Sequence, residues 1–204
     1  MPDHYTYSDS EILKNKLNIS DEAQLKRKED ALYSINLKRA YNTAVNAQEI
    51  NLSTLNTIHE QLFRDLYGWA GKPRRCELSK GGTPFCRHDF IEKEAGRILA
   101  ELARKNYYND LPKADYIKKL ADLYGDLNLL HPYREGNGRA LKILFHAITL
   151  KAGYEIDWTN VTKDEHLQAV IDTAHGKNER LEAVFERVLN EEVGLKQETL
   201  KTLK

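Results

Sequence analysis

The sequence predicts a mostly α-helical fold that carries a single β-hairpin. Apolar residues recur three and four positions apart over most of the chain, which is the spacing of one face of an α-helix. Only residues 76–86 are typical of two extended segments around a pair of glycines, the pattern of a hairpin turn. No internal repeat or low-complexity tract interrupts these patterns, so the 204 residues suit one domain with its own hydrophobic core.

Three helices are expected before the hairpin. Residues 8–17 favour a short helix with a serine or an aspartate available as its cap. An acidic first turn opens a longer helix over about residues 20–41. Residues 51–66 form the third helix, with leucine and isoleucine at helical spacing. We expect the two helices within residues 8–41 to pack on a core made by about residues 50–190.

The hairpin follows a helix-breaking stretch. Residues 67–74 contain two glycines and a proline. The turn of the hairpin centres near Gly81, and Pro84 is expected on an edge strand, where its missing N–H group is tolerated. Cys76 and Cys86 flank the turn. We expect them to be reduced thiols, because two cysteines make no disulfide framework.

Helical periodicity resumes after the hairpin. Proline disfavours helical geometry in the residue before it, so one helix should end at the His131-Pro132 step. Gly153 should stop the helix after that. The expected helices are residues 90–102, residues 114–130, the stretch between Arg139 and Gly153, residues 162–173 and residues 178–189. We expect one domain over residues 1–194 and a polar tail over residues 195–204.

The composition argues against several classes of partner. Lys+Arg and Asp+Glu number 31 each, so the formal net charge is zero and offers no broad attraction to nucleic acid or anionic membrane. No apolar run approaches the ~20 residues that span a bilayer, and no secretory signal is recognisable. We therefore expect a cytoplasmic protein that binds neither nucleic acid nor membrane, in which any phosphate chemistry is local.

The segment most informative about chemistry is His131-Pro-Tyr-Arg-Glu-Gly-Asn-Gly-Arg139. It places an imidazole, a carboxylate, two glycines around an amide, and an arginine directly before an apolar helical stretch. The first N–H groups of a helix have no partner inside the helix, and with the helix dipole they can hold a phosphate. Gly136 and Gly138 let the main chain approach a ligand closely. The sequence therefore predicts an anion-binding loop at a helix N-terminus.

The side chains of this loop offer complementary chemistry. His131 can be neutral near pH 7 and accept a proton from an attacking hydroxyl. Glu135 is a natural Mg²⁺ ligand beside bound phosphates, and Asn137 offers an amide donor. Arg139 and Lys142, three residues apart on one helix face, add two cations. Each residue alone would more often be a cap, a turn or a surface charge, but their concentration in one loop favours a functional site.

This loop resembles the motif of the Fic (filamentation induced by cAMP) family, which reads His-x-Phe-x-Asp/Glu-Gly-Asn-Gly-Arg-x-x-Arg. The chain has His131-Pro-Tyr-Arg-Glu-Gly-Asn-Gly-Arg-Ala-Leu-Lys142. Residues 58–74 resemble the segment before the family's flap, and Lys80-Gly-Gly-Thr-Pro-Phe-Cys86 resembles the flap hairpin itself. The N-terminal Tyr5-x-Tyr is similar to toxin-type and host-effector members, so the resemblance covers roughly residues 5–190.

The resemblance implies a Fic-like helical bundle with a β-hairpin flap next to the active-site loop. It also implies a protein adenylyltransferase, which transfers AMP from ATP to a Ser, Thr or Tyr hydroxyl of a target protein. His131 would be the base, and Glu135 would hold Mg²⁺ on the α- and β-phosphates. The phosphate-binding residues would be Gly136, Asn137, Gly138, Arg139 and Lys142. The flap would bind the target by strand addition, through Lys80, Gly81, Gly82, Thr83, Pro84 and Phe85.

Two departures from the motif stand out. Tyr133 replaces the family phenylalanine, and we expect its ring to turn inward and anchor the loop. Lys142 replaces the second arginine and lacks the bidentate fork, so we expect weakened or altered binding of the donor phosphates. Gly138 separates the chain from the Doc branch, which carries lysine at that position and transfers phosphate.

Regulation and alternatives follow from the same resemblance. Family members are often silenced by a helix with Ser/Thr-x-x-x-Glu-Gly/Asn, and the sequence has no match to it. The resemblance then implies inhibition in trans by a small, helical, antitoxin-like protein, unless Lys142 has already lowered activity enough to remove that need. Two other functions stay open: a catalytically weak nucleotide-binding module that docks a protein partner, and a Fic enzyme with another phosphate-linked donor. Action inside a bacterial cell and delivery into another cell both stay open.

Overall fold

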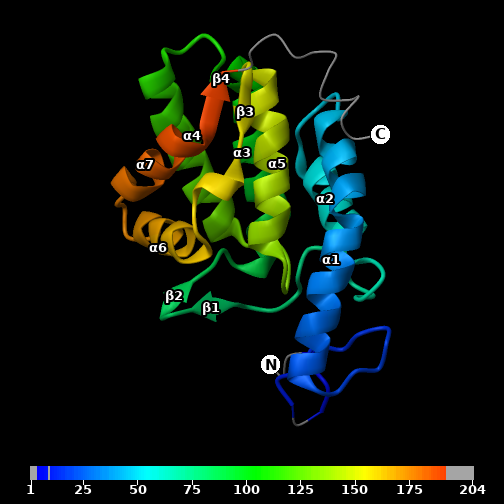
Figure 1. Cartoon of the computed structure of the whole chain (residues 1–204). Coiled ribbons are helices and arrows are strands. Elements are labelled where there is room, and N and C mark those ends of the chain that lie inside the picture. The colour runs from blue at the N-terminus through cyan, green and yellow to red at the C-terminus, as the bar shows by residue number, and fades with distance from the viewer. Residues whose placement is uncertain (1–3, 9, 192–204) are drawn as a thin grey trace.

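Seven α-helices and two short antiparallel strand pairs make up residues 4–8 and 10–191, the part of the chain that this computed structural model describes. The predicted mostly α fold is confirmed (Figure 1). The helices are α1 (Glu22–Val45), α2 (Leu52–Phe63), α3 (Ile91–Arg104), α4 (Lys113–Leu130), α5 (Asn137–Lys151), α6 (Lys163–Thr173) and α7 (Glu179–Val188). The strands are β1 (Ser79–Lys80), β2 (Thr83–Pro84), β3 (Tyr154–Ile156) and β4 (Leu189–Glu191), and 3₁₀ turns occur at η1 (His88–Phe90), η2 (Asn106–Tyr108) and η3 (Trp158–Asn160).

Helix α5 is the centre of the bundle. It contacts α1 and α2 on one side and α4 and β3 on the other. Nine of its 15 residues are buried, including Leu141, Leu144 and Phe145. A helix that is apolar nearly all round must be enclosed by others. The start of α5, which carries the conspicuous loop, is therefore held by packing rather than by local helix propensity.

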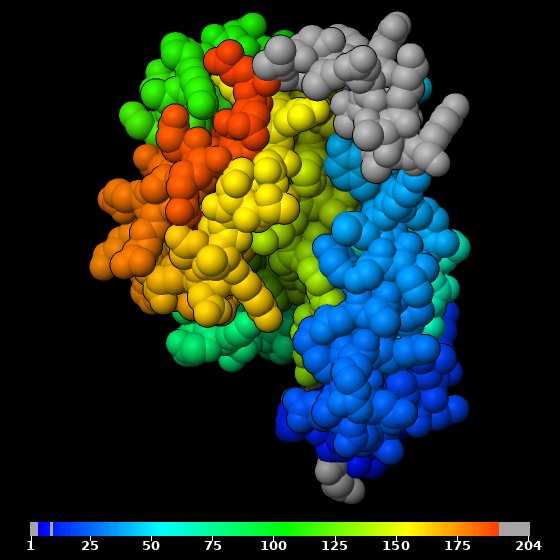
Figure 2. All heavy atoms as spheres, in the orientation of Figure 1, coloured from blue at the N-terminus to red at the C-terminus, as the bar shows by residue number. Residues whose placement is uncertain are grey.

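The surroundings of α5 can be followed in Figures 1 and 2. In Figure 2 the olive atoms of α5 lie at the bottom of a hollow between α1 and the yellow-to-gold segment that contains β3, η3 and α6. In Figure 1 the β1–β2 hairpin lies at the same end of the molecule as the first turn of α5. The fold thus brings the hairpin to the N-terminal end of the central helix.

The prediction of a helix over residues 8–17 is wrong. The described residues of this stretch form turns, and Thr6 pairs with Leu13 in an isolated β-bridge. The Asn15 side chain accepts the main-chain N–H groups of Leu17 and Ile19, which offers the backbone an alternative to helical bonds. The long second helix is confirmed as α1, which Asp21 caps by accepting the N–H group of Gln24.

The hairpin is confirmed, with a register that pairs Ser79 with Pro84 and Lys80 with Thr83. Its two-residue turn uses Gly81 and Gly82, whose φ angles are +57° and +81°. Positive φ at both central residues is the condition for the tight turn that matches strand twist.

A second strand pair, β3 with β4, was not expected from the sequence. Gly153, with φ +82°, ends α5 as predicted and turns the chain into β3, and β4 follows α7 directly. Strands of three residues carry too little alternation to be recognised by period. The predicted tail over residues 195–204 lies outside the described residues.

Candidate active site

The loop between α4 and α5 begins with a residue in an unusual conformation. His131 ends α4 with φ 44° and ψ 60°, in the left-handed region, and Pro132 follows it. The predicted end of the helix at this step is therefore confirmed. A non-glycine residue at positive φ is uncommon, so its surroundings must hold it there.

The imidazole of His131 is oriented by two contacts. Its Nδ1–H donates to the main-chain oxygen of Asn128 at 3.2 Å, which leaves the lone pair of Nε2 able to accept a proton. Its ring stacks on Phe85 of the hairpin, with centroids 3.8 Å apart and planes 8° apart. Burial lowers the pKa of His131 to about 4, so the ring is neutral at physiological pH.

Gly136 caps α5 in a conformation that requires glycine. Its φ is +83°, and an added Cβ would lie 2.4 and 2.6 Å from two ring carbons of Phe63. Gly138 has no atom within 4 Å of such a Cβ and is exposed. The two glycines therefore differ: the first is required by the fold, and the second leaves open space at the first turn of the helix.

The side chain of Asn137 shapes the loop. It is 3% exposed, its Oδ1 accepts the N–H group of Tyr133 at 2.8 Å, and its Nδ2 donates to the Tyr133 carbonyl at 2.7 Å. The amide that the sequence offers to a phosphate is thus bonded to the main chain of its own loop. The side chain of Asn137 is therefore not available to a ligand, whereas its main-chain N–H group belongs to the first turn of α5, where N–H groups have no partner inside the helix.

Tyr133 turns inward, as predicted. Its ring is fully buried and stacks on His59 at a centroid distance of 3.8 Å, and its hydroxyl donates to Asn56 Oδ1 at 2.8 Å. Both partners belong to α2. The loop is therefore anchored to α2 by the uncharged side chain of Tyr133.

Arg139 and Glu135 form an ion pair across the first turn of α5. The Nη2 of Arg139 donates to Glu135 Oε1 at 3.3 Å, and the same oxygen accepts the N–H group of Gly136 at 2.8 Å. A carboxylate thus already lies on two donors of the loop. Among the hydrogen bonds of the described residues, none uses the buried Nη1 of Arg139.

Lys142 reaches a different neighbour from Arg139. Its Nζ lies 5.0 Å from the ring centroid of Trp158, whose indole N–H donates to the Lys142 carbonyl at 3.3 Å. Partial burial lowers the pKa of this lysine below its usual value. The two cations therefore have different partners: Arg139 pairs with carboxylates, and Lys142 lies over an aromatic ring.

The hairpin residues named from the sequence lie close to the loop. Lys80, Gly81, Gly82 and Pro84 are exposed, and Phe85 contacts the imidazole of His131. A shallow groove on the hairpin is lined by Glu77, Leu78, Ser79, Pro84, Phe85 and Arg87. The hairpin therefore presents an exposed edge within reach of the base.

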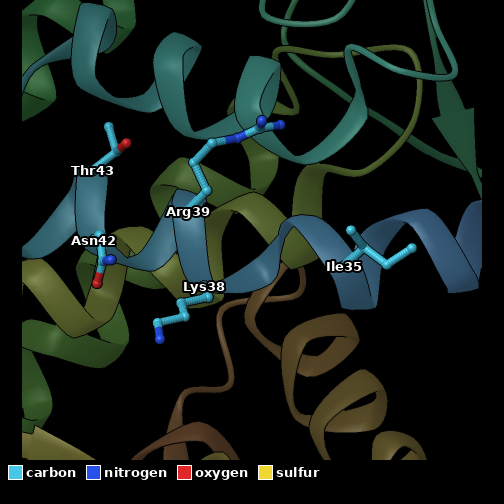
Figure 3. A pocket seen from close by; sticks show the side chains of 5 residues that line it. All are labelled: Ile35, Lys38, Arg39, Asn42 and Thr43. Atoms are coloured by element: carbon cyan, nitrogen blue, oxygen red, sulfur yellow. The ribbon is translucent and has the colours of Figure 1, made fainter. Parts of the chain in front are cut away.

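Another hollow runs along α1 and is lined by Ile35, Lys38, Arg39, Asn42 and Thr43 (Figure 3). Arg39 donates from this hollow to Asn36 and to the carbonyl of Gln61. None of its lining residues belongs to the loop after α4, and it contains no candidate base.

In the part of the chain that the structure describes, none of the helices has the length and the apolar character of a membrane span.

Comparisons with known proteins agree with this geometry. The Fic/DOC family model matches residues 49–149, which include the loop and the hairpin. The protein named "Probable protein adenylyltransferase Fic" from Escherichia coli (strain K12) is 35% identical over 189 residues, which cover 93% of this chain and 93% of that protein. The chain belongs to the Fic/DOC family.

Another relative and two solved structures match nearly the whole chain. "Protein adenylyltransferase VbhT" from Bartonella schoenbuchensis is 34% identical over 93% of this chain, which spans 39% of VbhT. The crystal structure of the effector BepC from Bartonella tribocorum, with bound AMPPNP, is 25% identical with a TM-score of 0.81 and covers 92% of this chain and 96% of that chain. An N-terminal Fic domain from Bartonella quintana with bound ADP is 25% identical with a TM-score of 0.85, covering 94% and 96%.

Two further residues, which sequence reasoning did not select, form hydrogen bonds with residues of the Fic motif. Glu29 of α1 is 5% exposed, accepts Arg139 Nη2 at 2.7 Å and accepts the Tyr67 hydroxyl at 2.5 Å. His59 of α2 is fully buried, and it accepts the N–H group of Gly71 through Nδ1 and donates from Nε2 to the Glu135 carbonyl at 2.9 Å. The only signal in the sequence was polarity at core-facing helix positions, which is typical of buried residues with partners.

Proposed function

We propose that this Fic domain is a protein adenylyltransferase that transfers AMP from ATP to the hydroxyl of a Ser, Thr or Tyr residue on a target protein. The observation that carries the proposal is the neutral imidazole of His131, which lies between the first turn of α5 and an exposed hairpin edge. The curated relatives bear adenylyltransferase names, and AMPPNP and ADP are bound in Fic structures of similar fold.

His131 supplies the base of the reaction. The Asn128 carbonyl holds Nδ1–H, so Nε2 accepts the proton of the target hydroxyl. The hydroxyl oxygen attacks the α-phosphorus of ATP, the bond between the α-phosphorus and the bridging oxygen breaks, and pyrophosphate leaves. A neutral base at pH 7 follows from the lowered pKa of this buried ring.

The first turn of α5 supplies the phosphate site. The main-chain N–H groups of Gly136, Asn137 and Gly138 face the triphosphate, and Arg139 neutralises the leaving pyrophosphate. The contact of the Glu135 carboxylate with Gly136 N–H and Arg139 supports this role, because an anion already uses these donors. Lys142 adds a point charge without the bidentate fork of arginine.

The residues of the loop fit a magnesium ion that arrives with the nucleotide. Glu135 has a side chain that is 48% exposed, and Mg²⁺ is usually held by one or two carboxylates together with phosphate oxygens and waters. The described residues contain no cluster of three or more His, Cys, Asp or Glu that could hold a metal on its own. When bound, Mg²⁺ would neutralise charge on the α- and β-phosphates.

The hairpin supplies the acceptor site. An extended segment of the target would add to the edge formed by residues 80–85, and main-chain pairing would set its hydroxyl beside His131 with little demand on sequence. The partners implied are a target protein with an exposed hydroxyl and, as a regulator, a small helical inhibitor in trans.

The test is transfer of label from α-³²P-ATP and Mg²⁺ to proteins of a bacterial lysate. We expect labelling by the wild type and none by His131→Ala, which removes the base and leaves the phosphate site, so its affinity for AMPPNP should stay within about 2-fold. Wild-type protein that labels nothing, while Lys142→Arg labels strongly, would favour the weak binding module. In a parallel assay with γ-³²P-ATP, label that moves only from the γ-position, or transfer from a donor other than ATP, would replace adenylylation by another transfer.

A further inference from the structure

A buried arginine lies where the hairpin meets the loop. Arg74 is 2% exposed, and among the described residues it forms no salt bridge with a carboxylate. Burial lowers its pKa below the usual value. A guanidinium in such a place must be satisfied by other acceptors, because an unpaired buried charge is very costly.

The acceptors are three main-chain carbonyl groups from separate segments. Nε donates to the His131 oxygen at 2.8 Å, Nη1 donates to the Cys76 oxygen at 2.5 Å, and Nη2 donates to the Cys86 oxygen. Cys76 precedes strand β1 and Cys86 follows strand β2, so they belong to the two stems of the hairpin. One planar group thus joins both stems to the residue that carries the base.

Main-chain bonds beside Arg74 connect the same segments. The N–H group of Arg74 donates to the Pro132 carbonyl at 2.7 Å, and the N–H group of Cys86 donates to the Leu129 carbonyl at 2.9 Å. The Phe85 ring, one residue from Cys86, stacks on the His131 ring. The base of the hairpin and the end of α4 are therefore one connected unit, whereas the hairpin tip at Gly81 and Gly82 is exposed.

The planar shape of the guanidinium group fixes the relative positions of the three carbonyl groups that it binds. Its donors are fixed in one plane at fixed separations, so three carbonyls bound to it are held at set distances from each other. The His131 carbonyl is one of these three, so the guanidinium fixes the two hairpin stems relative to the residue that carries the base, while the Asn128 carbonyl separately orients the imidazole. A lysine has the charge but only one donor atom and cannot span the three oxygens.

We propose that Arg74 is a positioning residue that sets the hairpin in register with His131, so that a hydroxyl docked on the hairpin edge meets the imidazole. This role rests on the proposed transfer reaction. It predicts a loss confined to transfer to the docked protein. Attack of water on the α-phosphorus of ATP, which gives AMP and pyrophosphate, needs no hairpin and should be spared.

The first experiment compares Arg74→Lys with Arg75→Lys, a change at the exposed neighbour. For Arg74→Lys we expect kcat for transfer to protein to fall on the order of 100-fold, since a misplacement of about 1 Å has that effect. Affinity for AMPPNP and the rate of ATP hydrolysis should stay within about 2-fold, and Arg75→Lys should behave as wild type. Transfer that stays within about 3-fold of wild type, or hydrolysis that falls in parallel with transfer, would overturn the role.

A second experiment uses the unmodified protein and needs no activity. Hydrogen exchange should be on the order of 100-fold slower at the amides of Arg74 and Cys86 than at Gly81 and Gly82, because the stems open only with the end of α4. Equal exchange at Cys86 and at the tip would show that nothing clamps the stems and would overturn the proposal. If the wild type exchanges slowly at these amides but labels no protein, the transferase function is contradicted, whereas the link between the hairpin stems and the end of α4 is supported.

Discussion

Replacing Gly136 by alanine tests the structure of the phosphate loop most directly. The residue has φ +83°, a conformation that costs an L-amino acid with a side chain about 1–2 kcal/mol. Its Cβ would lie 2.4 Å from Cε2 and 2.6 Å from Cζ of Phe63, and 3.1 Å from Nε2 of His59. Neither ring can swing away freely, because Phe63 is 2% exposed and His59 is held by hydrogen bonds on both ring nitrogens.

The expected magnitude follows from two contributions. Forcing an extra methyl group into a packed site costs about 1–3 kcal/mol. With the main-chain strain, the free energy of unfolding should fall by roughly 2–5 kcal/mol. For a chain of this size each kcal/mol lowers Tm by about 2–4 °C, so we expect Tm to fall by roughly 4–20 °C.

The matched control is Gly138→Ala, two residues along the same loop. Gly138 has no atom within 4 Å of an added Cβ and lies in α5, where alanine is favoured over glycine. Its free energy of unfolding should be unchanged or higher by less than about 1 kcal/mol. Urea and thermal denaturation of the two variants and the wild type provide the measurement. Equal stability of Gly136→Ala and Gly138→Ala would refute the assignment of a glycine-only cap at position 136.

Two further predictions concern buried charge and pH. Glu29→Gln should lower the free energy of unfolding by about 3 kcal/mol, because it leaves a largely buried Arg139 without its nearest carboxylate. Asp30→Asn, at a side chain that is 58% exposed, should have little effect. Equal urea midpoints for the two variants would contradict the buried pair. Burial lowers the pKa of His131, His146 and His166 to about 4 and that of His59 to about 3. These folded-state pKa values lie below the value of 6.5 for an unperturbed histidine in the unfolded chain. At pH values between the two, the unfolded chain therefore binds more protons than the folded chain. The contribution of these histidines to the free energy of unfolding is complete above about pH 6.5 and is lost as pH falls towards 4. Urea midpoints at pH 7.5, 6 and 5 test this, and midpoints that rise on acidification would reverse the sign.

The central loop and its helix could be read from local sequence. Pro132 ends α4 because of a steric rule between neighbouring residues, and Gly81 and Gly82 make a tight turn because only glycine adopts their φ angles freely. The apolar run after Arg139 predicts a buried α5, whose first turn must then expose unpaired N–H groups. All three depend on residues a few positions apart.

The short β elements and the first turns of the chain could not be read in this way. Asn15 bonds to main-chain groups two and four residues along, and this local network competes with a helix that periodicity alone favours over residues 8–17. The chain runs from β3 to β4 through α6 and α7, which pack on α4, so this pairing is not local in the sequence. Neither three-residue strand would be stable without that partner.

The partners of the loop were decided by packing over long separations. Glu29 reaches Arg139 across 110 positions, and His59 reaches the Glu135 carbonyl across 76. Arg74 bonds to His131 across 57 positions. Periodicity and motif spacing describe one element at a time, whereas these bonds exist because α1, α2 and the hairpin close around the start of α5. Local sequence could thus name the reactive groups, and only the assembled fold could say what holds them in place.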